Sequence, residues 1–408
     1  MVSFSSFALV ANSLLGVANA VSGTGGPLLG VSKTFTVNAV RNEKHKPNGP
    51  AEYARALARW NIDVPEAISR YSAVGGKVGS VGAATVSGDR EYISMIGLGT
   101  PPQKIPFDLD TGSSDLWVFT NATTIEGEAM SHRMDNRTIW NIEGSSTAAR
   151  IPNSTWSIQY GDGSFAYGDA WKDTVTVDGI EVKNAVVESA AVVSDLIAYD
   201  QAISGIFGLA YKLPSEVSPE QPTVLEAMGP LLEEKVISVD LKYLADGSYT
   251  FGKIDKTKFK GDLHYIDLIP EAQYWQFNFT GFHTEGANSW YLHQWAAIAD
   301  TGTSLLLIQE EITRKYYGAV EGANNTMSYW TFPCDAELPD FEMGFGNWSM
   351  TIPGHYVNYT YIDEWDTCMG GIQSARGQPF SILGDIFLKA VYIVFDFGHA
   401  RVGLAEKA

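Results

Sequence analysis

From Tyr92 onward, apolar and polar residues alternate in short runs, and the runs are separated by Gly, Asn and Asp. A period of two is typical of β-strands with one buried face, whereas helices repeat every 3.6 residues. Helical patterns are few in this part of the chain, so we predict a mostly β body with a few short helices. The clearest strand patterns are 156–160, 174–177 and 390–395, and the helix candidates are 224–232, 309–317 and 386–388.

One motif occurs twice in this body. Asp110 and Asp300 each end a short apolar run and each begin Asp-Thr-Gly, followed by Ser or Thr, then Ser, then apolar residues. Two apolar residues and a Gly recur 98 residues after the first Asp, at Gly208, and 84 residues after the second, at Gly384. Glycine in such a strand lets it pass close to another backbone. Because a buried carboxylate is costly unless it is hydrogen-bonded, the repetition predicts a duplicated lobe that supplies one carboxylate per copy.

The first 20 residues contain no charged side chain, and their apolar stretch ends in Ala18-Asn19-Ala20. Small residues at alternate positions after an apolar stretch are typical of a signal-peptide cleavage site, and this stretch is too short to span a bilayer. We expect residues 1–20 to be a signal peptide; a disordered N-terminus is the alternative. No later stretch is long and apolar enough for a membrane helix, and the C-terminus is no lipid-anchor signal, so no membrane anchor is expected.

Residues 21–83 differ in charge from the rest of the chain. They carry eight Lys and Arg against four Asp and Glu, whereas the remainder has 20 basic and 43 acidic residues. Residues 51–60 have a helical pattern, and the glycine-rich stretch 75–84 is typical of a flexible, cleavable segment. A basic segment ahead of an acidic body fits a pro-segment that covers an acidic cleft and ends between residues 76 and 90. An ordinary N-terminal linker is the alternative.

The whole chain is acidic, with a formal net charge of −19. Such acidity disfavours nucleic acid and anionic membrane surfaces as partners. A small number of Lys and Arg also limits the positive charge that accumulates at low pH. The composition therefore suits a protein that stays folded in acid, although simple solubility explains it equally well.

The cysteines and glycosylation sequons favour secretion. Cys334 and Cys368 are the two cysteines of the chain. In an oxidising compartment they would close a loop of about 35 residues, worth roughly 4 kcal/mol in the chain-entropy model; two buried free thiols are the alternative. Seven Asn-x-Ser/Thr sequons indicate surface positions of a secreted protein. They are Asn121, Asn136, Asn153, Asn278, Asn324, Asn347 and Asn358.

Residues 90–408 resemble a pepsin-family aspartic endopeptidase, most closely its secreted fungal members. The resemblance rests on the two Asp-Thr-Gly sites, the two apolar-apolar-Gly motifs, a flap-like hairpin and the late Cys pair, all in the family's order. It implies an all-β, bilobal, pepsin-like double β-barrel with a deep inter-lobe cleft, with lobes at 84–255 and 256–408. It also implies a secreted monomer that is made as a zymogen, needs no cofactor and cleaves polypeptides. A vacuolar destination is the alternative to extracellular secretion.

The resemblance gives Asp110 and Asp300 a joint catalytic role. Two carboxylates held about 3 Å apart cannot both ionise, so they share a proton and titrate as a pair; the family is itself the standard example of this behaviour. The ionised member would activate a water that attacks the peptide carbonyl, and the protonated member would hydrogen-bond to the oxyanion. The resemblance also assigns supporting roles. Thr111 and Thr301 would link the lobes by hydrogen bonds. Gly112 and Gly302 would let the backbone approach the carboxylates, and Ser113 and Thr303 would hydrogen-bond the outer carboxylate oxygens.

A second part of the resemblance is the flap. Residues 156–164 read as a hairpin whose turn is Gly161-Asp162-Gly163, with Ser164 after it. Tyr160 would close over the substrate and exclude bulk water. Trp117 would pair with Tyr160 through its indole N–H, which only donates; a plain core aromatic is the alternative for Trp117.

Specificity follows partly from the resemblance. The substrate would lie extended with apolar or aromatic side chains at the cut, and Asp162 with Ser164 would admit Lys next to the bond. Asp108 lies two residues before Asp110, and the strand period puts both on one face. We therefore expect Asp108 to border the pocket and to favour Lys or Arg there; a hydrogen-bonded structural carboxylate is the alternative.

Other chemistries find less support in the sequence. The seven His form no H-E-x-x-H pattern, so no metal site is expected. A non-catalytic binding protein of the same fold is the main alternative, and a glycosidase with paired carboxylates is a remote one. A basic residue before position 83 would meet the Asp pair in the precursor. Lys44 and Lys46 are the first candidates.

Overall fold

The computed structural model describes residues 33–42, 48–60, 62–66, 68, 92–126, 134, 136–159, 164–199, 201–362 and 366–408. Residues 32–408 form one compact unit. The predicted signal peptide at 1–20 and the predicted cleavage region at 76–90 lie outside the described residues. Within the described residues, no helix is long and apolar enough to cross a membrane.

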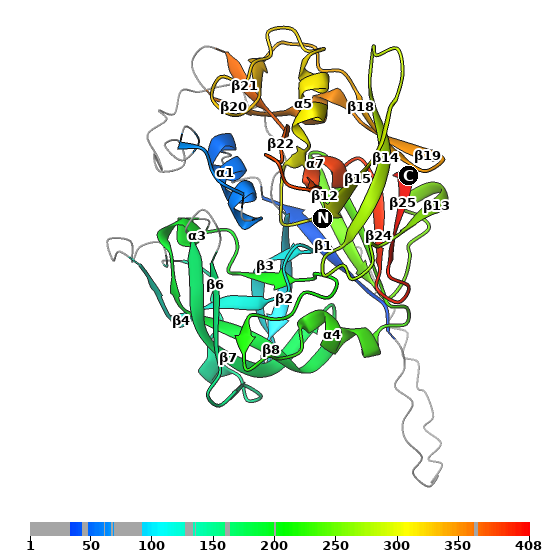
Figure 1. Ribbon diagram of the computed structural model, residues 1–408. Helices are drawn as coiled ribbons and strands as arrows, with labels where there is room; N and C mark the ends of the chain where they lie inside the picture. The colour runs from blue at the N-terminus through cyan, green and yellow to red at the C-terminus, as the bar shows by residue number, and fades with distance from the viewer. Residues whose placement is uncertain are drawn as a thin grey trace, which may run out of the picture. The chain divides into compact units, whose positions relative to one another are not determined.

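Both lobes are built from β-strands, so the predicted bilobal all-β fold is confirmed (Figure 1). The first lobe forms one part of a large sheet with the order β10-β6-β7-β8-β4-β9-β3-β2, and β5 pairs with β7. Its strands are β2 Tyr92–Leu98, β3 Gln103–Asp110, β4 Leu116–Ile125, β5 Ala149–Arg150, β6 Thr155–Gln159, β7 Phe165–Val177, β8 Ile180–Val193, β9 Gly205–Gly208 and β10 Val217–Ser218.

The second lobe contains a seven-stranded sheet with the order β19-β18-β14-β15-β23-β16-β22, and a three-stranded sheet β17-β21-β20. The strands of the larger sheet are β14 Gln276–Thr284, β15 Tyr291–Ala299, β16 Leu306–Ile308, β18 Phe341–Phe345, β19 Trp348–Ile352, β22 Ile372–Ser374 and β23 Phe380–Leu383. The smaller sheet consists of β17 Thr331–Pro333, β20 Asn358–Tyr361 and β21 Thr367–Gly370.

Six antiparallel strands continue the first sheet in the order β1-β12-β11-β24-β25-β13, and they combine segments from the start, middle and end of the chain. The first strand of this group precedes residue 83, and it pairs with both β2 and β12. The described residues of the predicted pro-segment are therefore part of the folded unit. The bounds are β1 Phe35–Arg41, β11 Val236–Lys242, β12 Ala245–Phe251, β13 Phe259–Asp267, β24 Tyr392–Asp396 and β25 Arg401–Lys407.

The predicted duplication is visible in the strand order. In the first lobe β3 runs parallel to β9 and pairs Asp110 with Gly208. In the second lobe β15 runs parallel to β23, and the residues just before Asp300 and Gly384 are paired. A side chain on either glycine would collide with the loop that follows the Asp, at Ser114 for Gly208 and at Leu305 for Gly384. The close approach predicted for these glycines is therefore confirmed.

The helices are short, and four of them agree with the sequence patterns. The predicted helix 224–232 is divided, because Pro230 cannot continue the α-helix; a 3-10 turn at Gly229–Leu231 follows α4. Two further helices, α3 and α6, had no clear pattern. The bounds are α1 Gly49–Arg59, α3 Asp195–Tyr199, α4 Val224–Met228, α5 Glu310–Tyr317, α6 Gly354–Val357 and α7 Asp385–Leu388.

Helix α1 lies between the two lobes, coloured blue in Figure 1. It begins at Asn48, whose side chain accepts a hydrogen bond from the N–H of Ala51, and Pro50 occupies its first turn. Tyr53 and Leu57 are fully buried on its inner face. The burial of this face holds the helix against the lobes, since a helix of this length is marginal alone.

The predicted disulfide is present between Cys334 and Cys368, whose Cα atoms lie 4.9 Å apart. It closes a loop in the second lobe and joins the end of β17 to β21.

Candidate active site

Asp110 and Asp300 lie at equivalent places at the ends of β3 and β15, and both are almost completely buried. The N–H of Gly112 donates to Asp110 Oδ1 over 2.8 Å, and the N–H of Gly302 donates to Asp300 Oδ1 over 3.0 Å. The other oxygen of each carboxylate accepts a hydroxyl, from Ser113 and from Thr303 respectively. Each buried carboxylate therefore has the hydrogen bonds that its burial requires.

Two threonines join the lobes beneath these carboxylates. The N–H of Thr111 donates to Thr301 Oγ1, and the N–H of Thr301 donates to Thr111 Oγ1, both over 3.0 Å. Each hydroxyl then donates to a carbonyl of the opposite lobe, to Ala299 from Thr111 and to Leu109 from Thr301. This reciprocal network fixes the two Asp-containing loops against each other.

The two glycines of the motif bring the carboxylates into opposition. A Cβ on Gly112 would lie 2.5 Å from Asp300 Oδ1, and a Cβ on Gly302 would collide with Asp110 Oδ1. No side chain other than hydrogen fits at either position. Each carboxylate is thus separated from the opposite lobe only by the backbone of that lobe's glycine.

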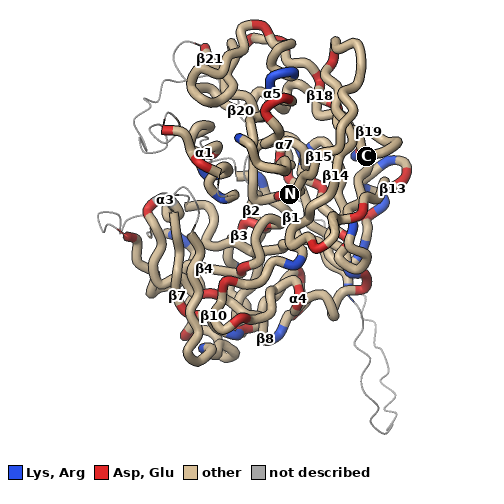
Figure 2. Tube along the Cα trace, viewed as in Figure 1, with Lys and Arg blue, Asp and Glu red and all other residues tan. Residues whose placement is uncertain are grey.

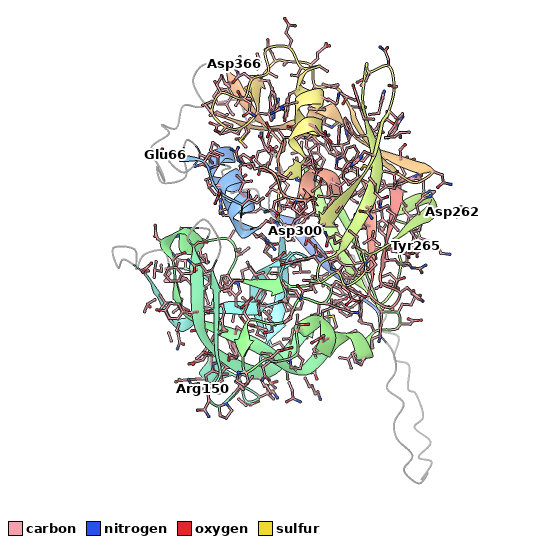
Figure 3. The ribbon with its side chains drawn as sticks, viewed as in Figure 1. Glu66, Arg150, Asp262, Tyr265, Asp300 and Asp366 are labelled. Carbon is pink, nitrogen blue, oxygen red and sulfur yellow. A yellow bond between two sulfur atoms is a disulfide. The ribbon has the colours of Figure 1, made fainter. Side chains whose placement is uncertain are left out.

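Arg59, in the last turn of α1, lies directly on this carboxylate pair. Its Nη2 forms a very short contact with Asp110 Oδ1 and lies 3.6 Å from Asp300 Oδ1, and its Nη1 donates to the carbonyl of Gly302 over 3.1 Å. The arginine is itself only 13% exposed. Figure 3 shows Asp300 between the lobes, next to the end of α1. One guanidinium therefore covers the carboxylate pair and balances part of its negative charge.

Further contacts hold α1 in place around Arg59. Trp60 is 8% exposed and makes edge-on contacts with Tyr274 and Phe380, at ring distances of 4.9 and 5.6 Å. Gln378 donates to the carbonyl of Trp60 over 3.2 Å, and the hydroxyl of Tyr53 donates to the carbonyl of Ser374 over 2.6 Å. All of these partners belong to the second lobe, so α1 is anchored there while Arg59 reaches both Asp residues.

The environments of the two carboxyls separate their proton affinities. Burial raises the pKa of Asp300 to about 6, against the lowering effect of Arg59. Burial acts in the same direction on Asp110, but the nearby Arg59, the Ser113 hydroxyl and the Gly112 N–H outweigh it and leave the pKa of Asp110 below its ordinary value. With Arg59 bound, Asp110 is therefore the ionised member of the pair.

Asp108 lies on the same face of β3 as Asp110, as the strand period predicts. Its neighbours Phe107 and Leu109 are buried on the opposite face, in the core. Burial, and then the charge of Asp110, raise the pKa of Asp108 well above its ordinary value. Asp108 is thus a third carboxyl beside the pair, and it favours the neutral form even with the charge of Arg59 nearby.

The predicted flap is only partly described. Tyr160, Gly161 and Asp162 lie outside the described residues, whereas Ser164 is buried at the start of the returning strand. Strands β6 and β7 pair antiparallel from Trp156–Gly168 to Gln159–Phe165, which is the pairing that the predicted hairpin requires.

Trp117 is 2% exposed and packs against Phe119 and Trp156. Its indole N–H has no acceptor among the described residues. The core role that was the alternative for Trp117 is therefore present, and its pairing with Tyr160 stays a prediction.

Arg59 is the residue that sequence reasoning missed. Lys44 and Lys46, the first candidates for the contact with the Asp pair, lie outside the described residues. The signal that would have found Arg59 is its place at the end of the predicted helix 51–60. A basic residue there interacts favourably with the helix dipole.

The sequon asparagines fall into two groups. The side chains of Asn278 and Asn358 are half-buried, and Asn358 donates to the carbonyl of Cys334. The exposed group consists of Asn121, Asn136, Asn153, Asn324 and Asn347. Among the described residues, no three His, Cys, Asp or Glu side chains are grouped so that they could hold a metal ion.

Comparison with known proteins agrees with this geometry. The family model described as eukaryotic aspartyl protease matches residues 91–407. The chain is 37% identical to aspergillopepsin-1 of Aspergillus flavus over 417 residues, which covers 100% of both chains. It is 36% identical to penicillopepsin-1 of Talaromyces stipitatus over 378 residues, 92% of this chain and 93% of that one, and 36% identical to podosporapepsin of Podospora anserina over 392 residues, 91% of each.

The chain therefore belongs to the eukaryotic aspartyl protease family. It is an aspartic-type peptidase, and its substrates are polypeptides. The alternatives of a non-catalytic binding protein and of a glycosidase are not favoured, since both Asp-Thr-Gly motifs are intact.

Proposed function

We propose that Asp110 and Asp300 together hydrolyse peptide bonds through a water held between them. The observation that supports this most strongly is the mirrored setting of the two carboxylates, each buried and each facing the other lobe across a glycine. The ionised member takes a proton from the water as the water attacks the peptide carbonyl. The protonated member donates a hydrogen bond to the developing oxyanion. Ionisation of both carboxyls removes that donor, so activity falls toward neutral pH.

The hydrogen bonds around the pair prepare it for this chemistry. The Gly112 N–H and the Ser113 hydroxyl stabilise negative charge on Asp110, and Gly302 and Thr303 do the same on Asp300. No side chain has to reorganise when the charge moves, which is the usual source of catalytic electrostatic stabilisation. Tyr160 of the predicted flap excludes bulk water when substrate is bound.

Residues 21–83 act as an inhibitory pro-segment. Strand β1 pairs with β2 and β12, α1 packs on the second lobe, and Arg59 covers both Asp residues. Figure 2 shows basic positions on α1 in blue. A peptide cannot reach the carboxylates while the guanidinium is there. The basic segment also complements an acidic body, which lowers the free energy of the inhibited form.

Activation is driven by acid. The pKa of Asp110 is held down by Arg59, so this ion pair contributes stability at higher pH and loses it as the pH falls through that pKa. Below about pH 4 most carboxylates become protonated, and the segment loses its partners. Release is followed by cleavage between residues 76 and 90. With a signal peptide at 1–20 and sequon glycosylation, the protein is exported as a monomeric zymogen, to the extracellular space rather than to a vacuole.

The test uses the full chain, acidified to allow activation, with casein as substrate. Asp110→Asn and Asp300→Asn should each lower kcat/KM by roughly 1,000-fold or more, because the pair acts as a unit. Asp262→Asn, which changes an exposed acid of β13, is the matched control and should leave the rate unchanged. Retention of more than a tenth of the activity in either Asp110→Asn or Asp300→Asn would contradict the dyad.

A further inference from the structure

Two more carboxyl groups are buried directly behind the first catalytic loop. Asp115 ends the loop that begins at Asp110, and it is 3% exposed. Glu188 lies on β8, opposite Trp117 of β4 and Ala170 of β7, and it is 2% exposed. The carboxyl of Glu188 is within hydrogen-bonding reach of the carboxyl of Asp115.

These two groups have few other partners. Oδ1 of Asp115 accepts from the N–H of Glu216 over 2.8 Å, and the hydroxyls of Ser114 and Ser215 make long contacts of 3.4 Å with Asp115 and Glu188 respectively. Apart from the carboxyl of Asp115, Oε2 of Glu188 has no hydrogen-bond partner among the described residues. In the part of the chain that the structure describes, no Lys, Arg or His forms an ion pair with either carboxyl, and the third charged neighbour, Glu216, is also an acid.

The duplicated lobe shows an alternative arrangement at the same place. Leu305 stands five residues after Asp300, where the first lobe has Asp115. Gln373 of β22 pairs with Leu307 as Glu188 of β8 pairs with Trp117, so Gln373 occupies the position of Glu188. Gln373 is fully buried, and its amide bonds to the N–H and the carbonyl of Trp330 and to the carbonyl of Gly370. The architecture is therefore compatible with uncharged groups at both positions.

Asp115 is also part of the connection that holds the catalytic loop. Its carbonyl accepts from the N–H of Gly208 over 3.0 Å, while Leu209 donates to the carbonyl of Asp110 over 2.6 Å and Ala210 donates to the carbonyl of Ser113 over 2.8 Å. A displacement of Asp115 would therefore be transmitted to the backbone that carries Asp110.

We propose that Asp115 and Glu188 are positioning residues that hold the Asp110 loop while the carboxyl of Glu188 is protonated and release it when that carboxyl ionises. The pair is thus a built-in limit on the pH range of the folded enzyme. It is separate from the catalytic pair, whose titration reverses at once when acid is restored.

The direction in which the pKa of Glu188 is shifted agrees with this role. Burial, and then the charge of Asp115, raise the pKa of Glu188 well above its ordinary value. A carboxyl with a raised pKa in the folded state contributes full stability below its unfolded pKa, and that stability is lost as the pH rises through the folded pKa. Above it, two buried anions and the nearby Glu216 repel one another without a cation.

The first experiment measures thermal unfolding of the full chain at pH 4 and pH 7, in an Asp300→Asn background that prevents self-cleavage. We expect Glu188→Gln, which copies the second lobe, to shrink the fall in Tm between these pH values by about 5 °C, with most of the gain at pH 7. Glu181→Gln, an exposed change on the same strand, should leave the fall unchanged. An equal fall in Glu188→Gln and Glu181→Gln would overturn the proposal.

Asp115→Asn removes the same repulsion from the other side, so it should reproduce the effect, and the double variant should add little more. Since the second lobe has uncharged residues at both positions, failure of both single variants to fold at pH 4 would also overturn the proposal. This unfolding measurement needs no catalysis, and its result stands apart from the dyad assigned under Proposed function.

A second readout uses the activated enzyme with its catalytic Asp residues intact, and it rests on the proposed function. Enzyme is incubated at pH 7, returned to pH 4 and assayed. The half-life at pH 7 should be about tenfold longer in Glu188→Gln than in wild type, while kcat/KM at pH 4 changes little. An unchanged half-life would contradict the positioning role, whereas absence of activity in every sample would instead count against the proposed function.

Discussion

The two Asp-Thr-Gly loops have nearly the same backbone and hydrogen bonds, but their surroundings differ in charge. Around Asp110 the chain places Asp108, Asp115 and Glu188. At the equivalent positions around Asp300 it places Ile298, Leu305 and Gln373. The shared part is what brings two carboxylates together, and the different part decides how each loop responds to pH. Duplication therefore supplied the geometry, and the two copies differ in the acidic residues placed around it.

The largest effect is expected from removing the cation that both loops share. Arg59→Gln takes away a buried, charge-assisted contact with Asp110 and a weaker one with Asp300. Hydrogen bonds to charged groups contribute about 1.5–3 kcal/mol, so the open form of the full chain should become roughly 10- to 100-fold more populated. The rate of self-activation at pH 5 measures this change.

A matched control for this variant is Arg55→Gln on the same helix, whose side chain is exposed. Arg59→Lys should lie between the wild type and Arg59→Gln, because a single ammonium cannot reproduce the planar fork that reaches Asp110 and Gly302 together. If Arg59→Gln activates no faster than Arg55→Gln, then the two loops are not held closed by their shared cation.

A smaller effect should distinguish the two loops by the pH dependence of kcat/KM. The hydroxyls of Ser113 and Thr303 each stabilise the ionised form of their own Asp and lower its pKa. If the division seen with Arg59 bound persists in the active enzyme, Ser113→Ala should raise the pKa of Asp110 and move the acidic limb of the kcat/KM profile upward by about one pH unit. Thr303→Ala should then raise the pKa of Asp300 and move the alkaline limb upward by a similar amount.

The measurement is kcat/KM for one peptide between pH 2 and 7. Ser189→Ala, a hydroxyl on β8 away from the pair, is the control and should leave both limbs in place. If both catalytic variants move the same limb, then the roles of Asp110 and Asp300 are not divided as their surroundings indicate.

The smallest effect is expected at Asp108, and it concerns specificity. Asp108→Ile copies the residue of the second loop at this position. Peptides with Lys beside the cut should lose about fivefold in kcat/KM, because the Lys cation favours the ionised form of Asp108 and the ion pair then contributes about 1 kcal/mol, while peptides with Phe should change little. Equal changes for both peptides would assign Asp108 the structural role instead.

Much of this protein follows from its sequence. The period-two pattern predicts the strands, because alternate burial is a local property of β structure. The repeated motif predicts the duplication and the two functional Asp residues, because Asp, Thr and Gly in that order serve a specific turn. The Cys pair is a property of composition, since two cysteines in an oxidising compartment have one way to pair. Helix α1 also follows from the sequence, because the helical pattern of residues 51–60 is a local property.

Other features were decided only by the tertiary structure. Arg59 meets the Asp residues because α1 packs on the second lobe through Tyr53 and Trp60, and no local pattern encodes that docking. Asp115 and Glu188 are far apart in sequence, and their proximity depends on the parallel pairing of β4 with β8. Sequence alone determined which residues are acidic and which alternate. The fold determined which acids are buried beside one another, because desolvation and charge repulsion depend on distances that only long-range pairing sets.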